Sequence, residues 1–385
     1  MGSDSVTLAF VMIRGNQWPW LKPVWEAARS QGHDVRIFGP PLVWPEINRA
    51  LDGLPDAVAV SVLMVPDGSN GEGSWRGPWI GIQHRVTDLL YLRDPARYAA
   101  VCVWSSSWLD WFACYRAIHP AAEARVGPPQ AIQALRDRAV VVGATLADLT
   151  HRADPATTRR RFDLPARFVV YLPFPARGNR EGRWAWRYAA PWPWGTEWEF
   201  VRTLRRACDR ADVGLVLKGR RKTPIPRWIT RLADCVIEED EPWEPTLLHV
   251  LEAGAVRLFH WMSCSVVEAA LAGVPSVCLA PEVGTWPPYH ARRVRVPKLE
   301  PLIGTYQGGF FAGWGEAVCG MEPRHAVRWL GRLEDSFAIT PTEPMLRRYR
   351  EMLLGESGAG KRIVDEASRQ VRLPSSGKVL ATRLT

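Results

Sequence analysis

The sequence lacks the features that mark exported and membrane-spanning proteins. It has no run of about 20 apolar residues, the length that a helix needs to cross a bilayer. The opening stretch MGSDSVTLAFVMI enters an apolar run directly, without the basic segment and small-residue cleavage site of a secretory signal. We therefore expect a cytoplasmic protein with no transmembrane segment.

The cysteines also lack the spacing that a disulfide framework or a zinc site needs. The chain has 7 cysteines, an odd number, and none of them form a Cys-x-x-Cys pair. This pattern favours reduced thiols, as in the cytoplasm.

Length and charge indicate two domains with different electrostatic character. A chain of 385 residues is too long for one ordinary hydrophobic core, which favours two domains of about 150 to 200 residues. The net charge is +9, yet residues 1–150 hold 13 Lys and Arg against 14 Asp and Glu, and the remainder holds 36 against 26. The second part of the chain is therefore the part that would attract a phosphorylated ligand or a polyanion.

A glycine-rich stretch near the end, LLGESGAGKRIVDEA, matches part of a phosphate-binding P-loop. Gly355 and the pair Gly360 and Lys361 have the required spacing, but Arg362 stands where a Ser or Thr would hold Mg²⁺. The preceding residues have helical periodicity, whereas a P-loop follows a buried strand. The pattern favours a turn between two late helices over an ATP site.

In the first half of the chain, apolar strand-like runs alternate with helix-like segments. Strands are expected at residues 6–13, 33–39, 56–65, 79–84, 98–104 and 138–143. An amphipathic run from Trp20 predicts a helix that ends at Gly32. Strands that alternate with helices predict a parallel sheet covered on both faces.

The same alternation restarts after a polar, arginine-rich connector at residues 144–166. Strands are expected at 168–174, 212–219, 234–239, 255–260 and 275–281, with helices between them. We expect an α/β protein with an acceptor-side domain at 1–150, a donor domain at 151–340, and helices at 341–385 that return to the first domain. Two such sheets create a cleft at the carboxyl ends of their strands, where ligands bind in open α/β sheets.

The segment VRLFHWMSCSVVEAALAGVPSVCLAPE, residues 256–282, is typical of a phosphate site. A strand ends near His260, Ser263 and Ser265 belong to the turn, and a helix carries Glu268 in its first turn. The positive end of the helix dipole and its unpaired N–H groups can hold a pyrophosphate, and Glu268 can reach ribose hydroxyls. In the alternative reading, Glu268 only stabilises the helix dipole.

These residues resemble a known family. The stretch VEAALAGVPSV and the late Gly-x₆-Arg-Ile pattern, Gly355 to Ile363, resemble the donor domain of GT-B glycosyltransferases, near the envelope-polymer and CDP-glycerol-transferase-like branches. Residues 10–40 resemble the first βαβ unit. The resemblance implies two Rossmann-like domains facing across a cleft. It also implies a nucleotide-sugar co-substrate, foremost a UDP-sugar, with no other cofactor. GESGAGKRI becomes the turn into a last helix that braces the first domain.

The resemblance implies further donor contacts in the second domain. Similar enzymes place a basic residue near the donor phosphates where Lys218 stands, and hold sugar hydroxyls at the position of Glu282. The alternative for Lys218 is a solvated charge in a run with Arg220, Arg221 and Lys222.

The catalytic base is less clear, because the family's usual histidine in the first βα turn is missing from RGNQWPW, where Gln17 cannot accept a proton. His84, which resembles a histidine of the CDP-glycerol-like branch and could be steered by Asp88, is one candidate, and a structural histidine is its alternative. Asp67 in the glycine-rich stretch VPDGSNGEGSW is a second candidate. The absence of an Asp-x-Asp pair argues against a metal-dependent GT-A enzyme, so we expect no essential metal.

A basic, tryptophan-rich stretch follows the first strand of the second domain, PFPARGNREGRWAWRYAAPWPWGTEW. Arginines pair with phosphates, and flat rings stack on bases or sugar faces, which suits an acceptor that is a nucleic acid or an anionic glycan. A membrane interface or a simply packed loop are the alternatives. The expected acceptor-binding residues are Arg177, Arg180, Arg183, Trp184 and Trp186.

The sequence thus predicts a metal-independent glycosyltransferase that moves a sugar from a nucleotide-sugar to a hydroxyl group. The acceptor is hydroxymethylated DNA, whose base would have to flip out of the duplex, or an envelope glycan. A nucleotide-sugar epimerase of the same fold and a non-catalytic nucleic-acid-binding module remain alternatives.

Overall fold

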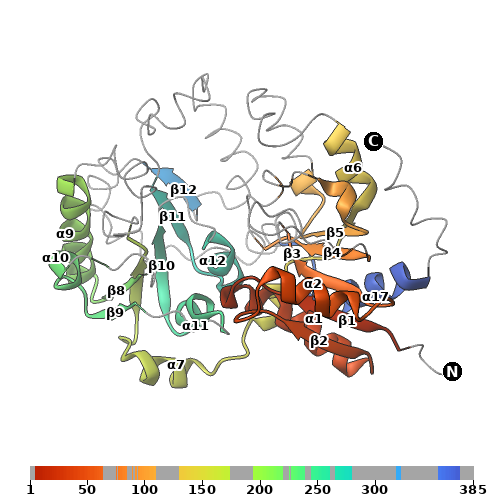
Figure 1. Ribbon diagram of the computed structural model, residues 1–385. Helices are drawn as coiled ribbons and strands as arrows, with labels where there is room; N and C mark the ends of the chain where they lie inside the picture. Colours follow the sequence, from red (N-terminus) through yellow and green to blue (C-terminus); the bar gives the residue numbers. More distant parts are fainter. Residues whose placement is uncertain are drawn as a thin grey trace. The chain divides into compact units, whose positions relative to one another are not determined.

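Figure 1 shows a computed structural model of the protein, which divides into two compact units. Unit 1 comprises Met1–Leu149, Pro242–Glu244 and Glu351–Thr385, and unit 2 comprises Thr150–Glu241 and Pro245–Arg350. The residues that the structure describes are 5–63, 75, 77–84, 89, 92, 94–109, 130–173, 194–219, 225, 227–238, 244–260, 265–279, 318–321 and 354–372.

Unit 1 contains a parallel sheet of six strands in the order β2-β1-β3-β4-β5-β6. The strands are β1 (Thr7–Val11), β2 (Asp34–Phe38), β3 (Val58–Val62), β4 (Trp79–Ile82), β5 (Ala100–Val103) and β6 (Ala139–Val141). Strands β3, β4 and β5 are buried along their whole length, because their apolar runs face helices or the core on both sides. The order reverses at β1, which pairs with β2 on one side and β3 on the other.

The helices of unit 1 include α1 (Trp18–Ser30), α2 (Trp44–Asp52), α6 (Gln130–Arg138) and α17 (Ala359–Arg372), with short 3₁₀ turns η1 (Gly15–Gln17), η2 (Pro95–Arg97) and η4 (Thr145–Leu149). Helix α17, from the far end of the chain, packs against α1 and η4. Two glycines with positive φ, Gly32 and Gly143, end α1 and precede η4. In unit 1, helices from near the two ends of the described chain therefore pack against each other.

Unit 2 contains a second parallel sheet, in the order β12-β11-β10-β7-β8-β9. Its strands are β7 (Phe168–Tyr171), β8 (Gly214–Lys218), β9 (Cys235–Ile237), β10 (Ala255–His260), β11 (Ser276–Leu279) and β12 (Val318–Met321). The strand order reverses between β7 and β10, which are neighbours in the sheet although two strands lie between them in sequence. In doubly wound sheets the ligand binds outside the carboxyl ends of the strands at such a reversal.

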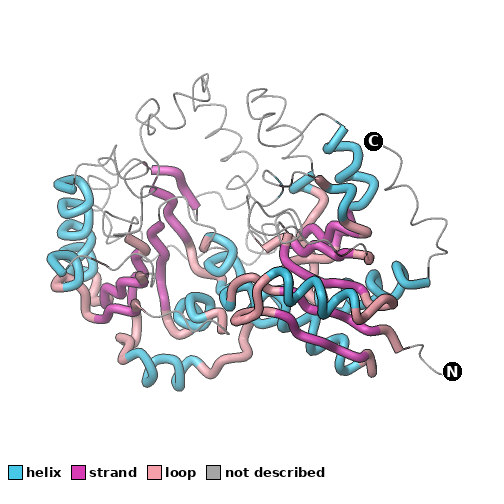
Figure 2. The backbone as a smooth tube through the Cα atoms, in the orientation of Figure 1, coloured by secondary structure: helices cyan, strands magenta, loops and turns pink. Residues whose placement is uncertain are grey.

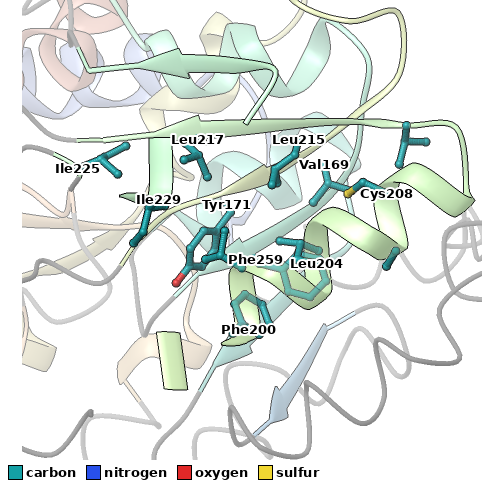
Figure 3. Packing of buried hydrophobic residues seen from close by; sticks show 13 residues of the cluster. Val169, Tyr171, Phe200, Leu204, Cys208, Leu215, Leu217, Ile225, Ile229 and Phe259 are labelled. Carbon is teal, nitrogen blue, oxygen red and sulfur yellow. The ribbon is translucent and has the colours of Figure 1, made fainter. Parts of the chain in front are cut away.

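Helices cover both faces of the unit 2 sheet (Figure 2). They are α7 (Pro155–Phe162), α9 (Trp194–Arg210), α10 (Arg227–Thr230), α11 (Thr246–Glu252) and α12 (Val266–Ala272). On one face, α9 and α10 bury Phe200, Leu204 and Ile229 against the sheet, and Figure 3 shows this cluster. On the other face, α11 and α12 pack through Val250 and Ala269.

Part of the predicted polar connector is helical, which corrects the sequence interpretation of residues 144–166. Helix α7 begins after Asp154, whose carboxylate accepts hydrogen bonds from Ala156 N (3.3 Å) and Thr157 N (2.8 Å). Pro155 occupies the first helical position, and Asp163 ends the helix in the left-handed conformation. These local capping signals outweigh the low apolar content that suggested a loop.

Backbone N–H groups of the glycine-rich turn before α17 are hydrogen-bonded to a side chain of the same protein. Asp148 Oδ1 accepts a hydrogen bond from Gly358 N (2.6 Å), and its Oδ2 accepts one from Gly360 N (2.8 Å). Arg362, which stands where a P-loop has Ser or Thr, donates to the Val142 carbonyl at 2.8 and 2.6 Å. The start of α17 thus holds a carboxylate of unit 1 at the place where a P-loop would hold a phosphate.

Candidate functional site

The strand ends at the reversal point of unit 2 carry a row of three residues in register. Phe259 of β10 pairs with Tyr171 of β7, and Tyr171 pairs with Leu217 of β8. The next residue on each strand therefore falls in one row across the sheet, and the Leu172 N–H donates to the Phe259 carbonyl at 2.9 Å. This row consists of His260, Leu172 and Lys218.

All three residues of the row lie on the face that α11 and α12 cover. Side chains alternate along a strand, and the residues two positions earlier, Leu258, Val170 and Val216, belong to the core cluster on that face. Neighbouring strands lie about 4.8 Å apart, so the Cα atoms of His260 and Lys218 are about 10 Å apart.

Both polar members of the row are buried. His260 is 0% exposed, and Lys218 is 5% exposed with its ammonium Nζ donating to the Gly219 carbonyl at 3.0 Å. Burial lowers the pKa of His260 to about 3, because the surrounding protein disfavours the imidazolium. The sequence alternative of a solvated Lys218 is therefore wrong, and the strand edge combines a neutral imidazole with a buried lysine.

Two helices of unit 2 begin after the strand ends and contribute hydroxyl groups. Thr246, the first residue of α11, is 4% exposed, and its Oγ1 makes no hydrogen bond with the described part of the chain. Ser265 is the N-cap residue of α12, but its side chain makes no capping hydrogen bond. Glu268 lies in the first turn of α12 and is half-buried. The starts of these two helices thus carry a buried hydroxyl, from Thr246, and a carboxylate, from Glu268.

In unit 1 the first βα turn is a closed structural turn. Gln17 is 5% exposed, and its Oε1 accepts hydrogen bonds from Ile13 N (2.8 Å) and Arg14 N (3.2 Å). A glutamine at this position satisfies two backbone donors that follow β1. The turn where the sequence resemblance led us to expect a histidine therefore has a structural role.

His84 follows β4 in unit 1 and lies against the ring of Trp20. It is 7% exposed, and its ring meets Trp20 edge to face at 6.2 Å between centroids. Trp20 stacks on Trp104 at 5.6 Å, and the Trp104 indole N–H donates to the Gln83 carbonyl at 2.7 Å. Packing against these tryptophans positions His84, whether His84 acts as a base or has a structural role.

The other predicted site residues fall outside the described residues. Their roles stay predictions, and they are Asp67, Arg177, Arg180, Arg183, Trp184, Trp186, Ser263 and Glu282. Among the described residues, no group of three or more His, Cys, Asp or Glu side chains is arranged to hold a metal ion. In the same part of the chain, no helix is both long and apolar enough to cross a membrane.

Sequence reasoning missed His260 and Thr246 as candidate site residues. His260 is the last residue of an apolar strand, and the sequence alone gives no sign that it shares a row with Lys218. That relation depends on the order and register of three strands that are distant in sequence. In the sequence, Thr246 looks like an ordinary threonine near a helix start.

No profile of a known protein family matches the sequence, and a search of curated proteins gives no match either. Solved structures, however, share the fold over nearly the whole chain. A variant of the wall teichoic acid polymerase TagF aligns with a TM-score of 0.55 and 11% identity, covering 96% of this chain and 89% of that one.

Two further structures match similarly. The UDP-GlcNAc 2-epimerase from Methanocaldococcus jannaschii aligns with a TM-score of 0.54 and 11% identity, covering 94% of this chain and 100% of that one. Arabidopsis thaliana UGT89C1 complexed with UDP-L-rhamnose aligns with a TM-score of 0.52 and 12% identity, covering 96% and 100%. These similarities, with the two observed sheets, confirm the predicted GT-B fold of two Rossmann-like α/β units.

Proposed function

We propose that the protein is a glycosyltransferase that moves a sugar from a nucleotide-sugar, foremost a UDP-sugar, to a hydroxyl group of an anionic polymer. The observation that carries this proposal is the buried row of His260, Leu172 and Lys218 at the strand reversal of unit 2. Solved structures of the same fold support it, because UGT89C1 was solved with UDP-L-rhamnose and the epimerase acts on UDP-GlcNAc.

The row and the two helix starts offer the groups that a nucleoside diphosphate needs. The Lys218 ammonium and the N–H groups at the start of α12 would bind the phosphates, and the Thr246 hydroxyl can donate a further hydrogen bond. Neutral His260 can donate one hydrogen bond without bringing a buried charge of its own. Glu268, one turn into α12, would accept hydrogen bonds from the ribose hydroxyls.

The reaction needs one bond to form as another breaks. The acceptor oxygen attacks the anomeric carbon, the bond to the diphosphate oxygen breaks, and the acceptor proton passes to a base. Lys218 and the α12 N–H groups stabilise the negative charge on the departing diphosphate. In unit 1, His84 or Asp67 would take the proton.

A donor-hydrolysis screen tests the activity. UDP-, GDP-, CDP- and dTDP-sugars are incubated with the protein, and the released nucleotide is measured, first alone and then with hydroxymethylated DNA or envelope glycan as acceptor. We expect release from a UDP-sugar, accelerated by one acceptor. His84→Ala should lower transfer at least about tenfold while donor binding is unchanged, since a general base contributes about 10²-fold or more. No release from any donor contradicts the proposal.

An epimerase is the second candidate, because the M. jannaschii UDP-GlcNAc 2-epimerase matches the fold about as well as TagF does, with TM-scores of 0.54 and 0.55. Incubation of the donor without any acceptor separates the two functions. An isomerised sugar in the product, detected by NMR, supports the epimerase, and transfer that requires an acceptor supports the transferase. A non-catalytic nucleic-acid-binding module predicts no binding of UDP at all.

A further inference from the structure

Helices α9 and α10 of unit 2 carry arginines that form no ion pair with a carboxylate of the described residues. Arg202 and Arg206 of α9 and Arg227 at the start of α10 are all exposed, and none of them forms an ion pair with a described residue. By contrast, Arg205 is only 20% exposed and contacts both Asp209 and Asp234. Arg205 thus binds Asp209 and Asp234, and the remaining exposed carboxylate of α9 among the described side chains is Glu199, three residues before Arg202.

Two of the outer arginines lie on one side of α9. Arg202 and Arg206 are four residues apart, so they lie about 6 Å apart along the helix axis. Both are exposed. A row of guanidinium groups at this spacing suits a ligand with repeated negative charges, because each fork-shaped group can hold one phosphate through two hydrogen bonds.

A pair of tryptophans joins α9 to α10 beside this row. Trp198 meets Trp228 edge to face at 5.3 Å between ring centroids, and Arg202 lies over the Trp198 ring at 5.8 Å. Both tryptophans are half-buried. Figure 1 shows α9 and α10 side by side in unit 2. The contact places Arg202 and Arg227 around the same aromatic pair.

The composition of this face favours a nucleic acid over a membrane or a plain polyol-phosphate chain. The exposed large apolar side chains of the described residues are Ile37, Leu42, Val43 and Val141, all in unit 1, so the described side chains of α9 and α10 include none to insert into lipid. A polyol-phosphate chain has no flat rings, whereas bases of a nucleic acid can stack on tryptophan and arginine.

We infer that the outer face of α9 and α10 binds the phosphodiester backbone of a nucleic acid through Arg202, Arg206 and Arg227. The role of this face as the binding surface for a polymeric acceptor rests on the proposed transferase function. Binding itself needs neither donor nor transfer, so the inference can fail while donor hydrolysis succeeds, and the reverse.

Anisotropy titrations of labelled duplex and single-stranded DNA between 50 and 200 mM salt test the inference. The full-length protein is compared with Arg202→Gln/Arg206→Gln and with Arg160→Gln/Arg167→Gln, which removes two exposed arginines elsewhere in unit 2. We expect the first pair to reduce the slope of log affinity against log salt by about 1.8 for duplex and about 1.4 for single strands, since each phosphate contact contributes about 0.9 or 0.7. The control pair should leave the slope unchanged.

Two competitors complete the test. Polyglutamate should displace DNA far less effectively than unlabelled DNA, because the arginine row recognises phosphate rather than charge alone. Equal loss of affinity in the two double variants overturns the inference, as does equal competition by polyglutamate. Tighter binding of poly(glycerol phosphate) than of DNA also overturns it, because the polymer would then not be a nucleic acid.

Discussion

The starts of helices α17 and α12 differ both in their sequence patterns and in their hydrogen bonds. Helix α17 in unit 1 follows a P-loop-like glycine pattern, yet Asp148 accepts hydrogen bonds from Gly358 N and Gly360 N. Helix α12 in unit 2 lacks that pattern, and its N-cap residue Ser265 makes no side-chain capping bond. The difference teaches that an anion site depends on what already fills the helix start, because a carboxylate of the same chain competes with any phosphate.

The same contrast extends to the neighbouring residues. In α17, the Arg362 guanidinium donates hydrogen bonds to the carbonyl groups of Val142 and Glu356, which are structural partners. Around α12, the buried polar groups His260 and Lys218 lie at the strand reversal, where ligands of doubly wound sheets bind. The start of α17 therefore has a structural role, and the binding role of the α12 start stays part of the proposed function.

The largest expected effect comes from blocking the turn before α17 with a single methyl group. Gly355 has φ of 66°, and a Cβ there would lie 2.2 Å from the Trp104 carbonyl oxygen. Gly355→Ala should lower the free energy of unfolding by about 2 to 5 kcal/mol, through left-handed strain and the clash with backbone. Urea denaturation measures the loss.

Gly358→Ala is the matched control for this substitution. Gly358 has φ of 84°, but the nearest atom to its Cβ would be Arg362 Nη1 at 3.5 Å, an ordinary contact. The control should cost only the backbone strain, about 1 to 2 kcal/mol. Equal losses in the two variants would show that the turn does not pack against Trp104 as described.

A second prediction concerns the pH dependence of unit 2. In the unfolded chain His260 has its ordinary pKa of about 6.5, whereas burial lowers the folded pKa to about 3. Between pH 6.5 and pH 3, His260 is protonated in the unfolded state but stays neutral in the folded state. Stability should therefore fall as the pH falls from 6.5 toward 3, by about 1.4 kcal/mol per pH unit.

His260→Gln should remove this part of the acid sensitivity, and urea denaturation at pH 7 and pH 5 measures it. His151→Gln is the control in the same unit, because the His151 side chain is 80% exposed. If the wild type and His260→Gln lose the same stability between the two pH values, His260 is not buried as a neutral group.

A smaller effect is expected from removing the side chain that caps the start of α17. Asp148→Ala removes two hydrogen bonds to backbone N–H groups and should destabilise unit 1 by about 1 to 2 kcal/mol, as loss of a helix cap does. Asp148→Asn should retain part of that stability, because its amide oxygen can still cap. Thermal unfolding compares the three proteins, and an Asp148→Ala variant as stable as the wild type contradicts the capping role.

Several elements of the fold were predictable from local sequence. Runs such as Val58–Val62 and Phe168–Tyr171 are apolar along their whole length, which indicates strands buried on both faces. Gly273 ends α12 in the left-handed conformation, as a glycine after a helix commonly does. The segment before it, from Val266, forms the expected helix. Alternation of these strands with helices was enough to predict two doubly wound sheets.

The candidate site was predictable only in part, because it depends on contacts between distant parts of the chain. Asp148 and Gly358 are 210 residues apart in sequence, so no local pattern predicts that one caps the other. The row of His260 and Lys218 likewise depends on β7 lying between β10 and β8. Glu268 and Lys218 were predicted because each lies at the end of a recognisable element.

The most direct test of the account is a calorimetric titration of UDP into the wild type, Lys218→Met and His260→Gln, with Lys361→Met and His151→Gln as exposed controls. We predict that UDP binds the wild type and both controls alike. The two buried-row variants, folded by circular dichroism, should bind at least about tenfold more weakly, the loss of one charge-assisted hydrogen bond. Absence of UDP binding to the wild type, or equal binding by all five proteins, would contradict the assignment of unit 2 as the donor site.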